Sequence, residues 1–282
     1  MPTALNNGHA VTVDETLADR LERALTDAST MRGQELERVD GNPLALEHRA
    51  FNGVRARLVG ADLAHYRYFS GPLGLRAAHI AVVPELADWY AQRNAPCFVR
   101  LSPLLASTDL LRALSLAGLA QTDFMSLLYG GTQVENAPSL AIRVEEIPRD
   151  DRQHLFLDLW TSAAPENERA LRQRLAQAEF AHWRCYVAFV DDVPAAHAAL
   201  FISAQTRTGV LAATWTLPAL RGKGCQTALV RRRLSDAALA GCDLVAVEAT
   251  PGSASQRNLE RMGLRLAYTR VTWTRELLLD SK

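Results

Sequence analysis

The segment from Thr214 to Gly241 restricts the fold most, because a strand pattern there turns through two glycines into a long helix pattern. Gly222 and Gly224 leave the backbone of the turn open to close approach, and the helix that follows adds unpaired N–H groups and the positive end of its dipole. Such a turn is suited to a phosphate or pyrophosphate, although a plain turn is the alternative. It has neither a Walker A nor a G-x-G-x-x-G pattern, which disfavours nucleotide hydrolysis and dinucleotide redox chemistry.

Periodic patterns on both sides of this turn predict an α/β (α+β) domain. Alternating or β-rich segments predict strands, and the apolar stripe of the long helix ends at Gly241. We expect mostly antiparallel hairpins and one strand–helix–strand crossover. The expected strands are 140–147, 183–190, 194–203, 208–217, 243–250 and 266–275, and helical segments are expected within 150–180, 218–241 and 253–263.

The turn also resembles the signature R/Q-x-x-G-x-G/A of the GNAT (GCN5-related N-acetyltransferase) family, which follows a short strand ending in a hydrophobic residue and proline. The matching run is Leu217-Pro218-Ala-Leu-Arg221-Gly-Lys-Gly224, and the similarity continues to Gly263-Leu264, over about half of the chain. The resemblance implies a mostly antiparallel sheet flanked by helices that binds acetyl-CoA or another acyl-CoA. The implied binding residues are Thr214, Trp215 and Thr216 for the pantetheine arm, and Arg221, Gly222, Lys223, Gly224, Cys225, Gln226 and Thr227 around the pyrophosphate.

The sequence departs from this family pattern at three positions. Gln226 replaces the usual Gly or Ala, and its side chain either narrows the pocket or adds a hydrogen bond. Family members often have an Asn at the start of the next helix and a Tyr seven residues later that protonates the leaving thiolate; here these positions hold Gly252 and Leu259. Leucine cannot donate a proton, and a positioned acid is worth about 10²–10⁴ in rate.

Glu248 is the best candidate for a catalytic base, because it is the one charge in an otherwise apolar strand. By resemblance this strand ends near the acyl group, and we expect burial to raise the pKa of the carboxyl toward a working value. The alternatives are that Glu248 points to solvent or only binds the substrate ammonium. His197 is the second candidate, although a lone strand histidine is more often structural. Cys225 has no accompanying His-Asp pattern and is interpreted as a core residue.

The first half of the chain repeats part of the same pattern, which suggests duplication. Both Cys97 to Gly118 and Cys242 to Gly263 span 21 positions, with similar strand, helix and glycine signals. The positions that face Arg221–Gly224 are Ala87–Tyr90, which cannot form an open anion-binding turn. Chance repetition is the alternative, since helix–glycine–strand patterns are common.

We therefore predict a tandem protein with two GNAT-like domains, the first divergent and without a CoA site. Its parts are a loose tail (1–12), the divergent domain (13–130), a linker rich in helix-breaking residues (131–138) and the acyltransferase domain (139–282).

Composition narrows the partners and the compartment. The 31 basic and 31 acidic residues cancel, which argues against nucleic acid or an acidic membrane surface, and the run Arg231-Arg232-Arg233 is interpreted as solvated helix faces. Four widely spaced cysteines without a Cys/His cluster predict neither a metal site nor disulfides. No apolar run approaches the ~20 residues that a membrane span needs, and the polar start of the sequence does not resemble a signal peptide. We therefore expect a cytoplasmic protein. The oligomeric state stays open.

The leading hypothesis is an enzyme that transfers an acetyl or similar acyl group from acetyl-CoA to an amine of a small molecule, with no metal. One rival is a non-catalytic acyl-CoA-binding or regulatory module, which the replacement of Tyr by Leu259 favours. A further rival is a CoA-dependent enzyme whose acceptor is not an amine.

Overall fold

The structure is a computed structural model that describes residues 13–61, 63, 66–133, 142–150 and 153–275. The expected tail and most of the expected linker lie outside the described residues. The α-helices are α1 (Glu15–Glu37), α2 (Val83–Ala91), α3 (Thr108–Leu116), α4 (His154–Trp160), α5 (Glu166–Glu179), α6 (Cys225–Leu239) and α7 (Ala254–Arg261). The strands are β1 (Leu46–Phe51), β2 (Val54–Val59), β3 (Gly71–Leu73), β4 (Cys97–Leu101), β5 (Ala120–Gly130), β6 (Arg143–Ile147), β7 (Arg184–Val190), β8 (Val193–Ser203), β9 (Thr208–Thr216), β10 (Leu244–Ala249) and β11 (Arg265–Arg275).

One eight-stranded sheet runs through both halves of the chain in the order β4-β11-β5-β10-β9-β8-β7-β6, and β1-β2-β3 form a smaller sheet. Only the β9–β10 pair is parallel in the large sheet, and α6 connects these two strands. The remaining neighbours are antiparallel, including the hairpin of β7 and β8 that turns at Asp191 and Asp192. The predicted mixed, mostly antiparallel fold with one crossover is confirmed.

A strand–helix–strand unit occurs twice, as predicted from the repeat. In β4–α3–β5 and in β10–α7–β11, a serine caps the helix by accepting a hydrogen bond from the third helical N–H group: Ser107 from Leu110 and Ser253 from Gln256. Both helices are followed by a left-handed glycine, Gly118 or Gly263, and both final strands have 11 residues. The two halves of the chain therefore contain the same strand–helix–strand unit.

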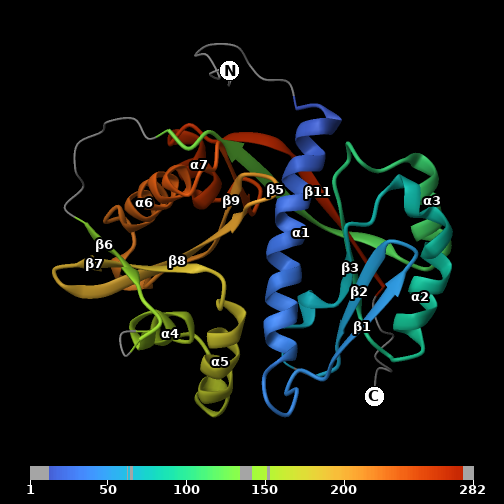
Figure 1. The fold of residues 1–282 in the computed structure, drawn as a ribbon, viewed down its shortest axis with the longest axis horizontal. Coiled ribbons are helices and arrows are strands. Elements are labelled where there is room, and N and C mark those ends of the chain that lie inside the picture. Colours follow the sequence, from blue (N-terminus) through green and yellow to red (C-terminus); the bar gives the residue numbers. More distant parts are fainter. Residues whose placement is uncertain (1–12, 62, 64–65, 134–141, 151–152, 276–282) are drawn as a thin grey trace.

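The two units share their last strands. β5 comes from the first half but lies between β10 and β11, and β11 comes from the second half but lies between β4 and β5 (Figure 1). The register is symmetric, since Arg265 faces Tyr129 and the corresponding Ala120 faces Thr274. The large sheet therefore contains strands from both sides of the boundary expected near residue 131, and that boundary stays a prediction.

Helices cover both faces of the sheet in the second half. Apolar residues of α6 and α7 pack on one face in a cluster with Leu128, Val245 and Val247, while helix α1 packs on the other face with Leu127 and Leu244. Period-two alternation along β5 and β10 sends neighbouring side chains to opposite faces, which explains the two clusters. Helix α1 belongs to the first half yet lies between the halves (Figure 1).

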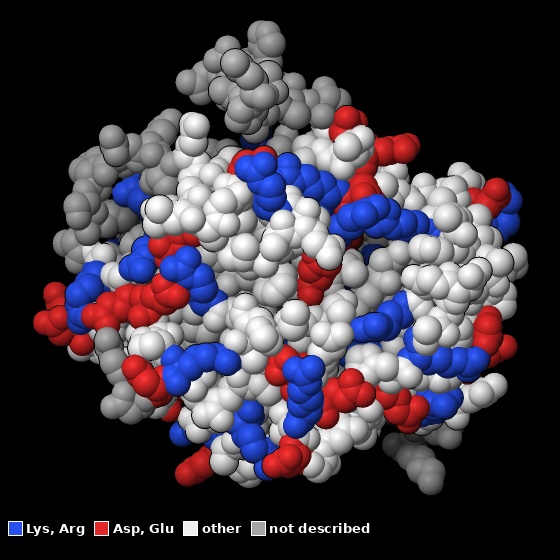
Figure 2. Space-filling model, viewed as in Figure 1, with Lys and Arg blue, Asp and Glu red and all other residues white. Residues whose placement is uncertain are grey.

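The surface carries mixed charge. Basic and acidic side chains alternate over the face shown in Figure 2, in accordance with the zero net charge of the sequence. Among the described helices, none is long and apolar enough to span a membrane.

Candidate functional site

Strands β9 and β10 separate at the centre of the sheet. Their parallel pairing ends at Leu211 and Val247, while β10 remains paired with β5 as far as Ala249. Past this point β9 follows β8, with a register shift near His197 and a left-handed φ of 53° at Ala213. An irregularity of this kind bends one strand away from its neighbour. The result is an opening in the sheet, bordered by the ends of β9 and β10.

Arg233 of α6 holds this irregular stretch of β9. Its side chain is 1% exposed and donates hydrogen bonds to the carbonyl oxygens of Leu229, Ala199 and Ala212, the last two at 3.1 and 3.3 Å. Burial lowers its pKa to about 9. The interpretation of Arg231-Arg232-Arg233 as solvated surface is therefore wrong at Arg233, because the carbonyl oxygens exposed by the bulge require a buried donor.

The glycine turn leads from β9 into α6 as the sequence predicts. Arg221 folds back, and its Nε donates to the carbonyl oxygen of Thr216 at 3.3 Å. Gly222 and Gly224 have φ values of 79° and 89°, a conformation that glycine adopts without strain, and no atom lies where a side chain at Gly222 would start. Gly224 is the N-cap of α6, and as a glycine it has no side chain that could cap this end. The first N–H groups of α6 are thus open to an anion.

The side chains at the start of α6 connect it to α7. The Gln226 amide donates to the Ser255 hydroxyl at 2.7 Å, and the Thr227 hydroxyl donates to the Asn258 side-chain oxygen at 3.2 Å. Gln226 also lines a cavity, and its amide hydrogen bond goes to α7 within the protein. Cys225 is buried, and burial raises its pKa, in accordance with a core residue.

A cavity of about 270 Å³ lies on the α6 side of the opening. It includes Thr214 and Trp215 of the expected pantetheine strand and also Leu259, whose side chain is 2% exposed. The side chain at the position where the family often has tyrosine is therefore a hydrocarbon that cannot donate a proton. Ser255 lines the same cavity, and its hydroxyl accepts from Gln226, which leaves its proton available for donation. Ser255 was not predicted, because in sequence it is an ordinary first-turn serine.

His197 lines this cavity as well, but its environment does not favour a base. The ring is 2% exposed and lies against the aromatic rings of Phe156, Trp160 and Trp215, with centroid separations of 5.3 to 6.0 Å. Burial is the main cause that lowers its pKa to about 4. A neutral imidazole with that pKa accepts protons weakly at neutral pH.

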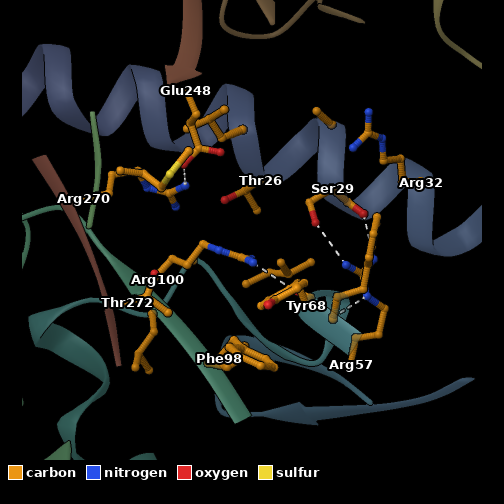
Figure 3. A pocket seen from close by; sticks show the side chains of 18 of the residues that line it. Thr26, Ser29, Arg32, Arg57, Tyr68, Phe98, Arg100, Glu248, Arg270 and Thr272 are labelled. Atoms are coloured by element: carbon orange, nitrogen blue, oxygen red, sulfur yellow. Dashed lines mark hydrogen bonds and ion pairs between the residues drawn. The ribbon is translucent and has the colours of Figure 1, made fainter. Parts of the chain in front are cut away.

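A larger cavity of about 1280 Å³ opens on the opposite face of the sheet, below α1. It contains residues of both halves, and Figure 3 shows Thr26 and Ser29 of α1 on one side and Arg100 and Phe98 of β4 on the other. Glu248 and three residues of β9, Leu211, Ala212 and Ala213, border both cavities. The two cavities therefore meet at the opening between β9 and β10.

Glu248 lies in this larger cavity within a carboxylate–guanidinium network (Figure 3). Its Oε1 accepts from Arg270 at 2.6 Å, and Arg270 donates to Glu22 at 2.9 Å. Burial alone would raise the pKa of Glu248, but the charges of Arg270 and Arg100, with the hydrogen bond from Arg270, hold it below its usual value. The expectation of a raised pKa is wrong, because the arginines that surround the carboxylate come from strands distant in sequence.

The first-half positions that correspond to the glycine turn lie inside a helix. Ala87–Tyr90 belong to α2, and Ala87, Trp89 and Tyr90 are buried in the core. Their backbone N–H groups are in a helix interior and not in an open turn. The absence of a CoA site in this half stays a prediction. Among the described residues, no group of three or more His, Cys, Asp or Glu side chains is placed to hold a metal ion.

Residues 151–264 match the sequence profile of the Acetyltransferase (GNAT) family. Residues 151–264 therefore form a GNAT-family domain. This domain contains the glycine turn, the opening and Glu248, and its family membership supports acyl transfer as the general activity. A search of curated proteins finds no match.

Solved GNAT structures share the fold of the whole chain. A GCN5-related N-acetyltransferase from Kribbella flavida has a TM-score of 0.61 at 16% identity, covering 88% of this chain and 94% of its own. One from Sphaerobacter thermophilus has a TM-score of 0.58 at 15% identity, covering 92% and 93%. A tandem GNAT protein from the clavulanic acid biosynthesis pathway has a TM-score of 0.55 at 13% identity, covering 94% and 96%. At these identities the likeness concerns the fold alone.

Proposed function

We propose that this protein transfers an acetyl or similar acyl group from acetyl-CoA to the amine of a small molecule. The observation that carries the proposal is the meeting of two cavities at Glu248, through the opening between β9 and β10. One cavity adjoins the open N-terminus of α6, and the other lies under α1. Two substrates can thus approach one point from opposite faces of the sheet without competing for space.

Acetyl-CoA fits the α6 side. The uncapped N-terminus of α6 and the left-handed Gly222 and Gly224 hold the pyrophosphate, with Lys223 adding positive charge. Thr214–Thr216 of β9 line the path of the pantetheine arm. When bound, acetyl-CoA supplies a thioester, so that an acceptor ammonium becomes an amide while one of its protons ends on the CoA thiol and another in solvent.

Glu248 receives the acceptor. It is ionised at neutral pH because Arg270 and Arg100 lower its pKa, and an ionised carboxylate attracts an ammonium. The same carboxylate is the candidate for proton acceptance, directly or through a water, although a lowered pKa makes it a weaker base. The Ser255 hydroxyl is the donor that we propose for the leaving thiolate, in place of the missing tyrosine.

A matched pair of glycine variants tests the CoA site. Gly224 and Gly241 lie at opposite ends of α6, both with positive φ, so Val at either position brings similar backbone strain. We expect Gly224→Val to abolish acetyl-CoA binding in calorimetry and Gly241→Val to retain it, with both proteins folded by circular dichroism. Undiminished affinity in Gly224→Val would remove the turn from the site.

A non-catalytic acyl-CoA-binding module is the second candidate, favoured by the hydrocarbon of Leu259 at the usual acid position. Incubation with acetyl-CoA and a library of small amines separates the two. The enzyme releases free CoA with at least one amine, whereas the module binds acetyl-CoA without turnover.

A further inference from the structure

The larger cavity is unusually basic for a chain with no net charge. Seven arginines line it, against three carboxylates: Glu22, Asp123 and Glu248. Two of these carboxylates, Glu22 and Glu248, already bind Arg270. A surplus of guanidinium groups in a concave site raises the local concentration of anions and repels cations.

Most of these arginines are occupied within the fold. Arg32, Arg76, Arg93 and Arg270 each form an ion pair with a carboxylate. Arg57 has no carboxylate partner among the described residues, but its three nitrogens donate to Phe69 and to Ser29 at 2.9 to 3.2 Å. The ion pairs offset the charges of these four arginines, while Arg57 keeps its positive charge but has few free donors. Arg275, at the end of β11, donates to the Ala87 carbonyl oxygen at 3.4 Å.

Arg100 is, with Arg270, an arginine whose charge lowers the pKa of Glu248. Its Nη2 donates to the Tyr68 carbonyl oxygen at 2.9 Å, and among the described residues no carboxylate lies within ion-pair distance. Figure 3 shows its side chain extending from β4 into the space below α1, with Arg57 nearby. Guanidinium groups bind carboxylate and phosphate oxygens through paired N–H groups. Arg100 is therefore the donor best placed to bind an anionic group in the cavity.

Glu248 and Arg100 border the same cavity without forming an ion pair with each other. Each influences the pKa of the other, so the two opposite charges lie in one electrostatic environment. A molecule with an ammonium at one end and an anionic oxygen group at the other matches this arrangement. A polycationic acceptor does not, because Arg57, Arg100 and Arg275, which have no carboxylate partner among the described residues, repel it.

We propose that the acceptor is a small amine that also carries an anionic oxygen group, in the simplest case the carboxylate of an amino acid. The ammonium lies at Glu248 and the anion at Arg100, in the cavity shared by the two halves. This inference rests on the proposed acyltransferase function and specifies its substrate class. The first half then contributes to substrate recognition through β4.

Pairs of acceptors that differ only in the anion test the inference. Each of a set of α-amino acids is compared with its carboxamide, and phosphoethanolamine with ethanolamine, by release of free CoA from acetyl-CoA. We expect kcat/KM to be at least about 10-fold higher for the anionic member, as is typical when a charged hydrogen-bond partner is removed. A larger preference in the phosphoethanolamine pair than in the amino-acid pairs would identify phosphate as the anionic group, and it would support the inference equally.

Variants of Arg100 assign the effect to this residue. We expect Arg100→Met to lower kcat/KM for anionic acceptors by about 10- to 100-fold, mainly through KM, and to change kcat/KM much less for the acceptors that lack the anionic group. Arg100→Lys keeps the charge but loses the paired N–H geometry, so an intermediate loss is expected. The control is Arg112→Met, an exposed arginine of α3 whose partner is Asp109.

The outcomes separate this inference from the proposed function. Two results would overturn the inference without affecting the acyltransferase function. One is equal or faster turnover of the acceptors that lack the anionic group, and the other is an unchanged KM of Arg100→Met for anionic acceptors. Absence of CoA release with every amine, while acetyl-CoA still binds, overturns the acyltransferase function and with it this substrate class. Calorimetry of acetyl-CoA binding to Arg100→Met, expected to equal wild type, shows that the variant is folded.

Discussion

At the scale of single residues, the role of Glu248 in binding or proton transfer depends on its neighbour Arg270. It shares Arg270 with Glu22, so Glu248→Gln and Glu22→Gln each remove one carboxylate from the same guanidinium. If Glu248 is the base, Glu248→Gln lowers kcat by about 100-fold or more, and the loss shrinks at high pH as free amine becomes available. If it only binds the ammonium, KM rises with kcat nearly unchanged. Steady-state kinetics with both variants decides, and wild-type values for Glu248→Gln would remove this residue from the site.

His197 makes a pH-dependent contribution to stability. Burial lowers its pKa from 6.5 in the unfolded chain to about 4 in the folded protein. Between these values the unfolded chain binds a proton that the folded protein does not, so stability falls as pH falls. The expected loss from pH 7 to pH 4 is about 3 kcal/mol. His197→Gln cannot titrate, and urea unfolding should show a correspondingly smaller decrease. The same decrease in both proteins would contradict this assignment.

At the scale of elements, the opening between β9 and β10 depends on the bulge near Ala213. Arg233 stabilises it through the carbonyl oxygens of Ala199 and Ala212. We expect Arg233→Met to weaken acetyl-CoA binding by about 10-fold or more, because small displacements of binding groups are costly. Arg232→Met is the control, since Arg232 is the adjacent, more exposed member of the same run and pairs with Asp236. Equal affinities of the two variants in calorimetry would show that Arg233 does not support the site.

At the scale of the whole molecule, the exchange of β5 and β11 makes the halves interdependent. A fragment of residues 142–282 lacks β5, which leaves the edges of β10 and β11 unpaired. We expect this fragment to aggregate or unfold alone, and to form one complex when produced together with residues 1–133. Size-exclusion chromatography with circular dichroism measures this. A monomeric, folded 142–282 fragment that binds acetyl-CoA with full affinity would contradict it.

The complete protein should bind one acetyl-CoA per chain, since Ala87–Tyr90 lie in a helix.

The sequence alone determined the features that depend on local chemistry. Gly222 and Gly224 predicted the turn, Ser253 the start of α7, and the repeated 21-residue spacing the two units, because caps, turns and periodicity involve residues close in the chain. The missing acid at Leu259 was also evident, since a side chain's chemistry does not depend on the fold.

Only the tertiary structure decided the electrostatics of the site and the sharing of strands. Arg270 and Arg100 lower the pKa of Glu248 from β11 and β4, and no local pattern predicts which charges converge there. Arg233 appears identical to its neighbours in sequence, yet it alone of that run is buried against β8 and β9. The place of β5 in the sheet follows from pairing with β10 and β11, about 115 to 155 residues away. Such contacts join residues that are far apart in the chain, so local sequence patterns do not predict them and only the folded structure shows them.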